Sequence, residues 1–205
     1  MSLDTENQLK RLYKTYNDSV KLLIADLEAR NQSFPIEIFN EIRAFTDHVA
    51  RCYLPGKTEE DIQNELVKAE GHIIRTLLDC YKCLNVYFFD TIEHFEKKDM
   101  KYVDLSYVDN GRFMITLRNM KNEAVAFSRE ARRYESQDKA AALQYYEKMY
   151  LKYVEIETYI ENNSAHLLWA KDKFFKNKAR SFVVWLLTLL AGVVISWIFQ
   201  YFILQ

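Results

Sequence analysis

Glycine, proline and cysteine are all scarce in this sequence, which has four glycines, two prolines and three cysteines among 205 residues. Glycine and proline mark hairpins and the ends of strands, so their scarcity disfavours a sheet and favours long helices. The cysteines, Cys52, Cys80 and Cys83, do not have the spacing of a disulfide framework. We therefore expect reduced thiols and no disulfide bond.

The motifs of the common enzyme classes are also missing. The sequence has no glycine-rich phosphate loop, no G-x-S-x-G and no H-E-x-x-H, and its histidines are scattered at His48, His72, His94 and His166. Such motifs supply the geometry for nucleotide hydrolysis, acyl transfer and zinc hydrolysis. The lone C-x-x-C that ends at Cys83 falls inside a predicted helix and lacks a second ligand pair, so we interpret it as structural. The sequence predicts a protein that is not an enzyme and has no cofactor or metal site.

Charge is nearly balanced over the chain, with 28 basic and 29 acidic residues and a formal net charge of −1. This balance argues against bulk attraction to nucleic acid, so an anionic ligand would need a local patch. Residues 181–205, in contrast, contain no charged residue. The run from Phe182 to Leu204 provides the roughly 20 apolar residues that a helix needs to cross a bilayer. We predict a transmembrane helix here, with a buried helix of a soluble protein as the alternative.

Basic residues crowd into the segment that precedes the predicted span. Residues 171–180 carry one acid, Asp172, and the cations Lys171, Lys173, Lys176, Lys178 and Arg180. By the positive-inside rule, this asymmetry predicts a cytoplasmic N-terminal domain on an inner or plasma membrane. The N-terminal residues MSLDTENQLKRLYK contain no apolar core of a signal peptide, so we expect a tail-anchored, single-pass protein.

Helical periodicity predicts an all-α fold, namely an antiparallel helical bundle with long helices and one C-terminal transmembrane helix. A first helix covers about 4–30, where apolar residues repeat at three and four: Leu9, Leu12, Tyr16, Val20, Leu23 and Leu27. Pro35 in a first helical turn, after Ser33 and Phe34, starts a second helix, and Leu54-Pro55-Gly56 ends it. A third helix runs from the N-cap Thr58 to about Lys98.

The remaining segments complete this bundle. Residues 101–111 are expected to form a loop with a short extended segment, and a fourth helix covers about 112–136. A fifth helix begins near Lys139 and meets no proline before the span. The predicted domains are a cytosolic helical bundle over 1–170, a basic juxtamembrane segment over 171–180 and a transmembrane helix over 181–205.

Aromatic residues form two stripes at helical spacing. One stripe comprises Tyr146, Tyr150, Tyr153 and Ile160, and the other comprises Val86, Phe89, Ile92 and Phe95. We interpret both as core packing. A platform for base stacking would use the same rings but would leave them exposed, and exposure cannot be deduced from the sequence.

A basic face is the strongest candidate for a binding site. At 100° per residue, four cations of the fourth helix fall within about 80° of arc, and they are Arg118, Lys121, Arg129 and Arg132. The opposite side carries core-like residues, which are Met120, Phe127, Ala131 and Tyr134. Arginine forks match phosphate oxygens, so this basic stripe predicts a site for an anionic ligand such as a nucleotide or oligonucleotide. A solvated surface is the alternative.

In the predicted span, small and polar residues recur at four-residue spacing on one side of the helix, and this side shifts gradually around the helix axis. The residues are Thr188, Gly192, Ser196 and Gln200. We call these residues the polar stripe. Small residues allow close approach of helices, and polar groups in lipid need partners or water, so the stripe predicts helix packing in a homo-oligomer or a pore lining. The alternative is a passive anchor whose hydroxyl groups bond to their own helix.

Taken together, the helical cytosolic part, residues 112 to 133 and residues 171 to 200 resemble the transmembrane effectors of bacterial anti-phage defence. In layout the chain is similar to the effector of the Hailong system. This resemblance implies a membrane part that assembles into a channel, gated by a DNA-oligomer signal that a partner nucleotidyltransferase makes. It is a resemblance of layout, and no binding residue of that family is transferred to this chain.

The sequence thus predicts a tail-anchored membrane effector that oligomerises to form or gate an ion-conducting pore in response to a cytosolic ligand. Several copies would be needed, because one span has too few polar groups to conduct. The alternative is a tail-anchored adaptor or tether, whose helical bundle binds a partner protein while the span only localises it.

Overall fold

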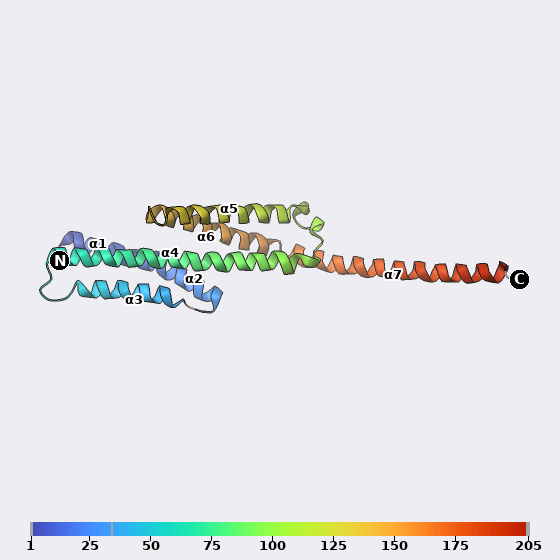
Figure 1. The fold of residues 1–205 in the computed structure, drawn as a ribbon, viewed down its shortest axis with the longest axis horizontal. Coiled ribbons are helices and arrows are strands. Elements are labelled where there is room, and N and C mark those ends of the chain that lie inside the picture. Colours follow the sequence, from blue (N-terminus) through green and yellow to red (C-terminus); the bar gives the residue numbers. More distant parts are fainter. Residues whose placement is uncertain (1, 34, 204–205) are drawn as a thin grey trace. The chain divides into compact units, whose positions relative to one another are not determined.

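The computed structural model describes residues 2–33 and 35–203, and every regular element within them is helical (Figure 1). The helices are α1 (Leu3–Thr15), α2 (Lys21–Asn31), α3 (Ile36–Arg51), α4 (Glu59–Lys98), α5 (Phe113–Tyr134), α6 (Lys139–Asn162) and α7 (Ser164–Ile203). A π-helical turn, η1 (Tyr16–Val20), joins α1 to α2. Three 3-10 turns connect α4 to α5: η2 (Asp99–Tyr102), η3 (Leu105–Tyr107) and η4 (Asp109–Gly111). The predicted all-α class is confirmed.

The ends of α4 illustrate how local sequence sets a boundary. Thr58 Oγ1 accepts a hydrogen bond from the Asp61 backbone N–H at 3.2 Å, and Asp61 Oδ2 accepts one from the Thr58 N–H at 3.0 Å. This reciprocal cap satisfies two N–H groups that the first helical turn leaves without partners. No proline follows, and α4 continues for 40 residues, through Gly71, to Lys98.

Three details differ from the expected boundaries. Pro35 has an extended backbone (φ −65°, ψ 125°) and lies just before α3 rather than in its first turn, while Phe34 falls outside the described residues. The 101–111 connection contains 3-10 turns and no strand, because Asp109, Asn110 and Gly111 all have positive φ. The fifth helix is interrupted at Asn163, whose side-chain amide donates to the Tyr159 carbonyl at 2.9 Å.

The chain divides into two compact units. Unit 1 comprises Met1–Glu93 with Asn119–Ile156, and unit 2 comprises His94–Arg118 with Glu157–Gln205. Helices α4, α5 and α6 therefore contribute to both units. The division of the chain at residues 170 and 180, into a bundle, a juxtamembrane segment and a span, stays a prediction.

Aromatic stacking forms much of the core of unit 1. The Phe88 ring stacks on Tyr153 with centroids 5.1 Å apart, and Tyr81 stacks on Tyr146 at 6.3 Å. Tyr146 and Tyr153 are fully buried, which confirms the core interpretation for these members of their stripe. Burial raises the pKa of the Tyr153 hydroxyl to about 12, so it stays protonated at neutral pH.

The second aromatic stripe is only partly in the core. Ile92 is buried, but Val86 and Phe89 are exposed, so the core interpretation is wrong for these two residues. The reason is the direction in which α4 faces its partners. In this stretch of α4 the buried positions are Leu84, Phe88 and Ile92, which follow one another at four-residue spacing and leave Phe89 beside the core rather than in it.

Unit 2 is organised around the start of α5, the end of α6 and the first part of α7. Phe113 is buried and stacks on Tyr159 with centroids 5.2 Å apart. The Tyr159 hydroxyl donates to Asp109 Oδ2 at 2.8 Å, which holds η4 against α6. Turns η2 and η3 contact α7, where Tyr107 meets Trp169 edge to face at 5.1 Å.

A charged cluster joins α3 to α4 within unit 1. His48 Nδ1 lies 2.7 Å from Glu65 Oε2, and Lys68 Nζ lies 3.0 Å from Glu65 Oε1. The His48 ring stacks on His72 with centroids 5.1 Å apart, and His72 bonds to Glu41. The hydrogen bond to His48, followed by that to Lys68, lowers the pKa of Glu65 to about 2.

We expect Glu65→Gln to destabilise the protein in a pH-dependent way. A hydrogen bond to a charged group contributes about 1.5–3 kcal/mol, so the free energy of unfolding should fall by about that amount at pH 7. Because the folded pKa of Glu65 is about 2 and the usual value is 4.5, this stabilisation is complete above pH 4.5 and is lost as pH falls through 2. Urea unfolding in micelles at several pH values, followed by circular dichroism, measures the difference.

Glu70→Gln is the matched control, because Glu70 is an exposed carboxylate on the same helix. It should leave stability close to that of the wild type at every pH. A Glu65→Gln effect that is equally large at pH 7 and pH 2 would contradict the assignment to the carboxylate charge.

Candidate anion-binding site

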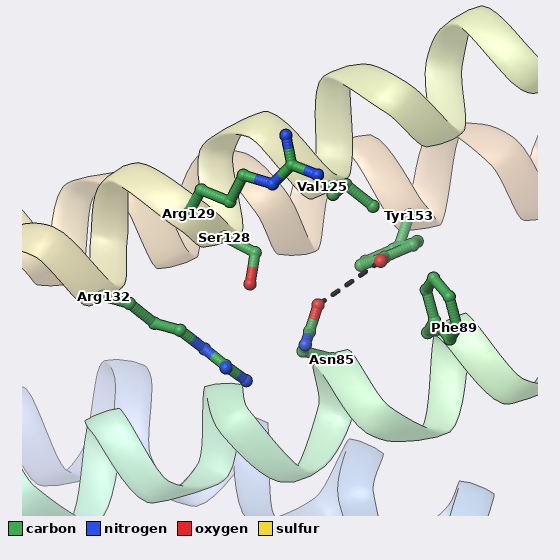
Figure 2. Close-up of a pocket in the computed structure, with 7 residues that line it drawn as sticks. All are labelled: Asn85, Phe89, Val125, Ser128, Arg129, Arg132 and Tyr153. Carbon is green, nitrogen blue, oxygen red and sulfur yellow. Dashed lines mark hydrogen bonds between the residues drawn. The ribbon is translucent and has the colours of Figure 1, made fainter.

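An open cavity of about 240 Å³ lies between α4, α5 and α6 of unit 1 (Figure 2). It is lined by Asn85, Phe89, Val125, Ser128, Arg129, Arg132 and Tyr153. The four α5 residues follow one another at spacings of three, one and three, and the two α4 residues are four apart. Both sets therefore occupy one side of their helix, and the two sides face each other across the cavity.

The structure distributes the four residues of the basic stripe over two environments. Arg129 and Arg132 line the cavity, and Lys121 Nζ lies 5.0 Å from the centre of the Phe89 ring, which is part of the wall. Arg118 belongs instead to unit 2, where its Nε lies 3.9 Å from Glu96 Oε1. The site thus brings together two of the predicted residues, adjoins a third and does not include Arg118.

The basic stripe borders the buried side of α5 rather than opposing it. The buried positions of α5 are Phe113, Leu117, Met120, Ala124, Ser128 and Ala131. Of the predicted core residues, Met120 and Ala131 are buried, whereas Phe127 and Tyr134 are only half-buried. Because the cations lie at the margin of the contact with α4, they can reach a ligand held between the two helices.

Positive charge in the cavity is not cancelled locally. Within residues 2–33 and 35–203, neither Arg129 nor Arg132 forms an ion pair with a carboxylate. The nearby Glu135 pairs with Lys82 and accepts a hydrogen bond from the Tyr146 hydroxyl at 3.1 Å. Two guanidinium groups therefore remain able to bind an anion, with geometry that suits phosphate or carboxylate oxygens.

Neutral polar and aromatic groups complete the wall. The Tyr153 hydroxyl donates to Asn85 Oδ1 at 3.3 Å and fixes the orientation of that amide (Figure 2). Ser128 points toward α4, and Phe89 presents a ring that is 37% exposed. An exposed ring beside two arginines can hold a flat aromatic group next to a phosphate. Among the described residues, no cluster of histidine, cysteine or acidic groups could hold a metal ion.

Helix α7 carries the second set of predicted residues. Its apolar part has a mean hydropathy of 2.5 over its best window, and it is the one described helix long and apolar enough to cross a membrane. Residues 182–203 are all exposed, so this chain by itself does not bury the apolar part of the helix. The basic segment lies on the same helix, where Lys176 Nζ is 2.5 Å from Asp172 Oδ2.

The polar stripe is exposed over its whole length. The Thr188 hydroxyl donates to the Val184 carbonyl at 2.8 Å, so this group needs no partner outside its own helix. A Cβ built at Gly192 meets no atom within 4 Å, which leaves room for a second helix to approach. Ser196 and Gln200 are exposed and carry polar groups that lipid cannot satisfy.

Sequence reasoning missed Asn85, Val125 and Ser128 as cavity residues. A polar Asn85 four positions before Phe89 on an otherwise apolar stretch of α4 was the available signal. Comparison of the chain with protein-family models, curated proteins and solved structures found no match.

Proposed function

We propose that the protein is a membrane effector, anchored by α7 with its bundle in the cytoplasm, that oligomerises to form or gate an ion-conducting pore when an anionic ligand binds. The observation that carries this proposal is the exposed apolar part of α7 with its polar stripe. Lipid around a lone helix cannot satisfy the exposed Ser196 and Gln200 side chains, whereas a water-filled assembly of several copies can.

The cavity in unit 1 supports the ligand-dependent part of the proposal. Arg129 and Arg132 offer two guanidinium groups without an ion pair among the described residues, and Phe89 offers an exposed ring. A nucleotide or short DNA oligomer combines phosphate and flat bases and fits this chemistry. The resemblance in layout to anti-phage effectors favours such a signal, supplied by a partner enzyme.

A tether is the second candidate, and two observations favour it. Thr188 satisfies its own hydroxyl within α7, as a passive anchor would. On α3, Ile36 and Phe39 are exposed large apolar residues, which a partner helix could cover. In this function the span localises the bundle and conducts nothing.

Potassium efflux from liposomes that contain the purified full-length protein tests the pore against the tether. We expect efflux that increases when a short oligodeoxynucleotide is added to vesicles whose bundles face outward. External protease reports that orientation, because it should digest the bundle and leave only the span protected. Liposomes that stay sealed without ligand, with ATP and with the oligonucleotide would support the tether.

A further inference from the structure

The first part of α7 contacts two aromatic rings, Tyr102 and Tyr107, from a distant segment of unit 2. The Tyr102 ring of η2 lies 6.0 Å from Phe174 and 5.7 Å from Phe175. Turn η2 contacts α7 although some 70 residues separate them in the chain. These contacts place η2 beside the helix just before its apolar part begins.

Turn η2 carries one lysine, Lys101, and one acid, Asp99, and it lies beside the basic segment of α7. Lys101 is exposed, and its Nζ lies 5.3 Å from the centre of the Tyr102 ring. On α7, Lys176, Lys178 and Arg180 are also exposed, and the single acid of the basic segment, Asp172, pairs with Lys176. We define the juxtamembrane collar as Lys101, Tyr102, Phe175, Lys176, Lys178 and Arg180.

The distance from the apolar part of α7 places the collar at the level of lipid headgroups. Phe175 precedes Phe182 by seven residues, which is about 10 Å along a helix. The polar layer of a bilayer is roughly 5–8 Å thick on each side of its hydrocarbon core. With Phe182 at the hydrocarbon boundary, Lys178 and Arg180 lie within that layer, and Phe175 with the neighbouring Tyr102 ring lies just outside it. Lys101 lies against the Tyr102 ring, and charges near a membrane surface attract over a Debye length of about 8 Å.

We propose that the juxtamembrane collar binds anionic phospholipid headgroups, and that η2 contributes Lys101 to this surface. This inference rests on the membrane insertion of α7 in the proposed function, but it does not depend on whether the protein conducts ions. The collar as defined consists of four cations and two aromatic residues, and aromatic residues favour the membrane interface. Each lysine near an anionic surface strengthens binding by roughly fivefold.

Spin-labelled lipids test the proposal in vesicles that contain the full-length protein. The electron-spin resonance spectrum gives the association of phosphatidylglycerol relative to phosphatidylcholine. We expect the wild type to prefer phosphatidylglycerol and Lys101→Gln to reduce this preference by roughly two- to fivefold. Added salt should reduce the wild-type preference as well. Lys101→Arg should keep it, and so should Lys139→Gln, which removes an exposed lysine of unit 1.

Three outcomes would overturn the proposal, and flotation of the vesicles separates them. Protein that floats with the vesicles but shows the same preference with Lys101→Gln would remove η2 from the lipid surface while leaving the span intact. Protein that does not float would overturn both the span and the collar. Loss of oligonucleotide binding by Lys101→Gln in detergent, with unchanged lipid preference, would assign Lys101 to a soluble anion instead.

Discussion

Liposomes that contain the triple variant Thr188→Val, Ser196→Ala and Gln200→Leu are expected to keep a potassium gradient that liposomes with the wild-type protein lose. The three substitutions keep α7 long and apolar, so insertion and abundance should be normal. A pore lined by these residues would lose its hydrophilic surface and dewet, and its conductance should fall to that of protein-free vesicles. Potassium efflux measures the effect, and the absence of toxicity on overexpression is the expected result in cells.

The opposite face of α7 offers a matched control. At 100° per residue, Leu187, Val194 and Ile198 lie on the side away from the polar stripe. Leu187→Val, Val194→Ala and Ile198→Leu together should conduct like the wild type. Thr188→Ser keeps the hydroxyl that bonds to Val184 and should also conduct. Equal conductance of the polar-stripe variant and the wild type would remove these residues from the pore.

The double variant Arg129→Gln and Arg132→Gln is expected to lose at least roughly 100-fold in affinity for a fluorescent oligodeoxynucleotide. Each hydrogen-bonded contact between a charged arginine and a phosphate contributes about 1.5–3 kcal/mol, and the variant removes both cavity arginines. The plot of log affinity against log salt should also become less steep by about 1.4, since each contact with a single strand contributes about 0.7. Fluorescence anisotropy at several salt concentrations measures both quantities.

Two single variants show whether oligodeoxynucleotide binding depends on the cavity or only on positive charge. Arg133 is an exposed arginine of α5 that pairs with Glu130 at 2.9 Å and does not line the cavity, so Arg133→Gln should bind nearly normally. Arg118 lies in unit 2 near Glu96, and Arg118→Gln should have a small effect too. Glutamine is a fair helix former, so circular dichroism should not change. Normal binding by the double variant would exclude the cavity as the oligodeoxynucleotide-binding site.

Much of the helical layout could be predicted because the signals are local. The reciprocal cap at Thr58 and the absence of proline define α4, and the scarcity of glycine and proline leaves few other breaks. The error at Pro35 has the same local origin. Proline suits both the first turn of a helix and the extended residue just before it, and the sequence does not distinguish the two.

The candidate site was predicted less completely because it depends on packing between helices. Phe88 and Phe89 are adjacent and equally apolar, yet one is fully buried and the other is 37% exposed. Which of the two rings is buried depends on where α5 and α6 pack, and the periodicity of α4 alone does not reveal those positions. For the same reason, the sequence grouped Arg118 with Arg129, although these residues belong to different units.

The continuity of α7 has a mechanical consequence. From Ser164 to Ile203 the helix contains no proline and has Gly192 as its one glycine, so no flexible linker separates the collar from the apolar part. A helix resists torsion along its hydrogen-bonded length. A turn of the helix about its axis near Phe175 would therefore be transmitted as nearly the same angle to Thr188. Rotation of α7 about its axis at the collar would therefore turn the polar stripe toward or away from the centre of an assembly.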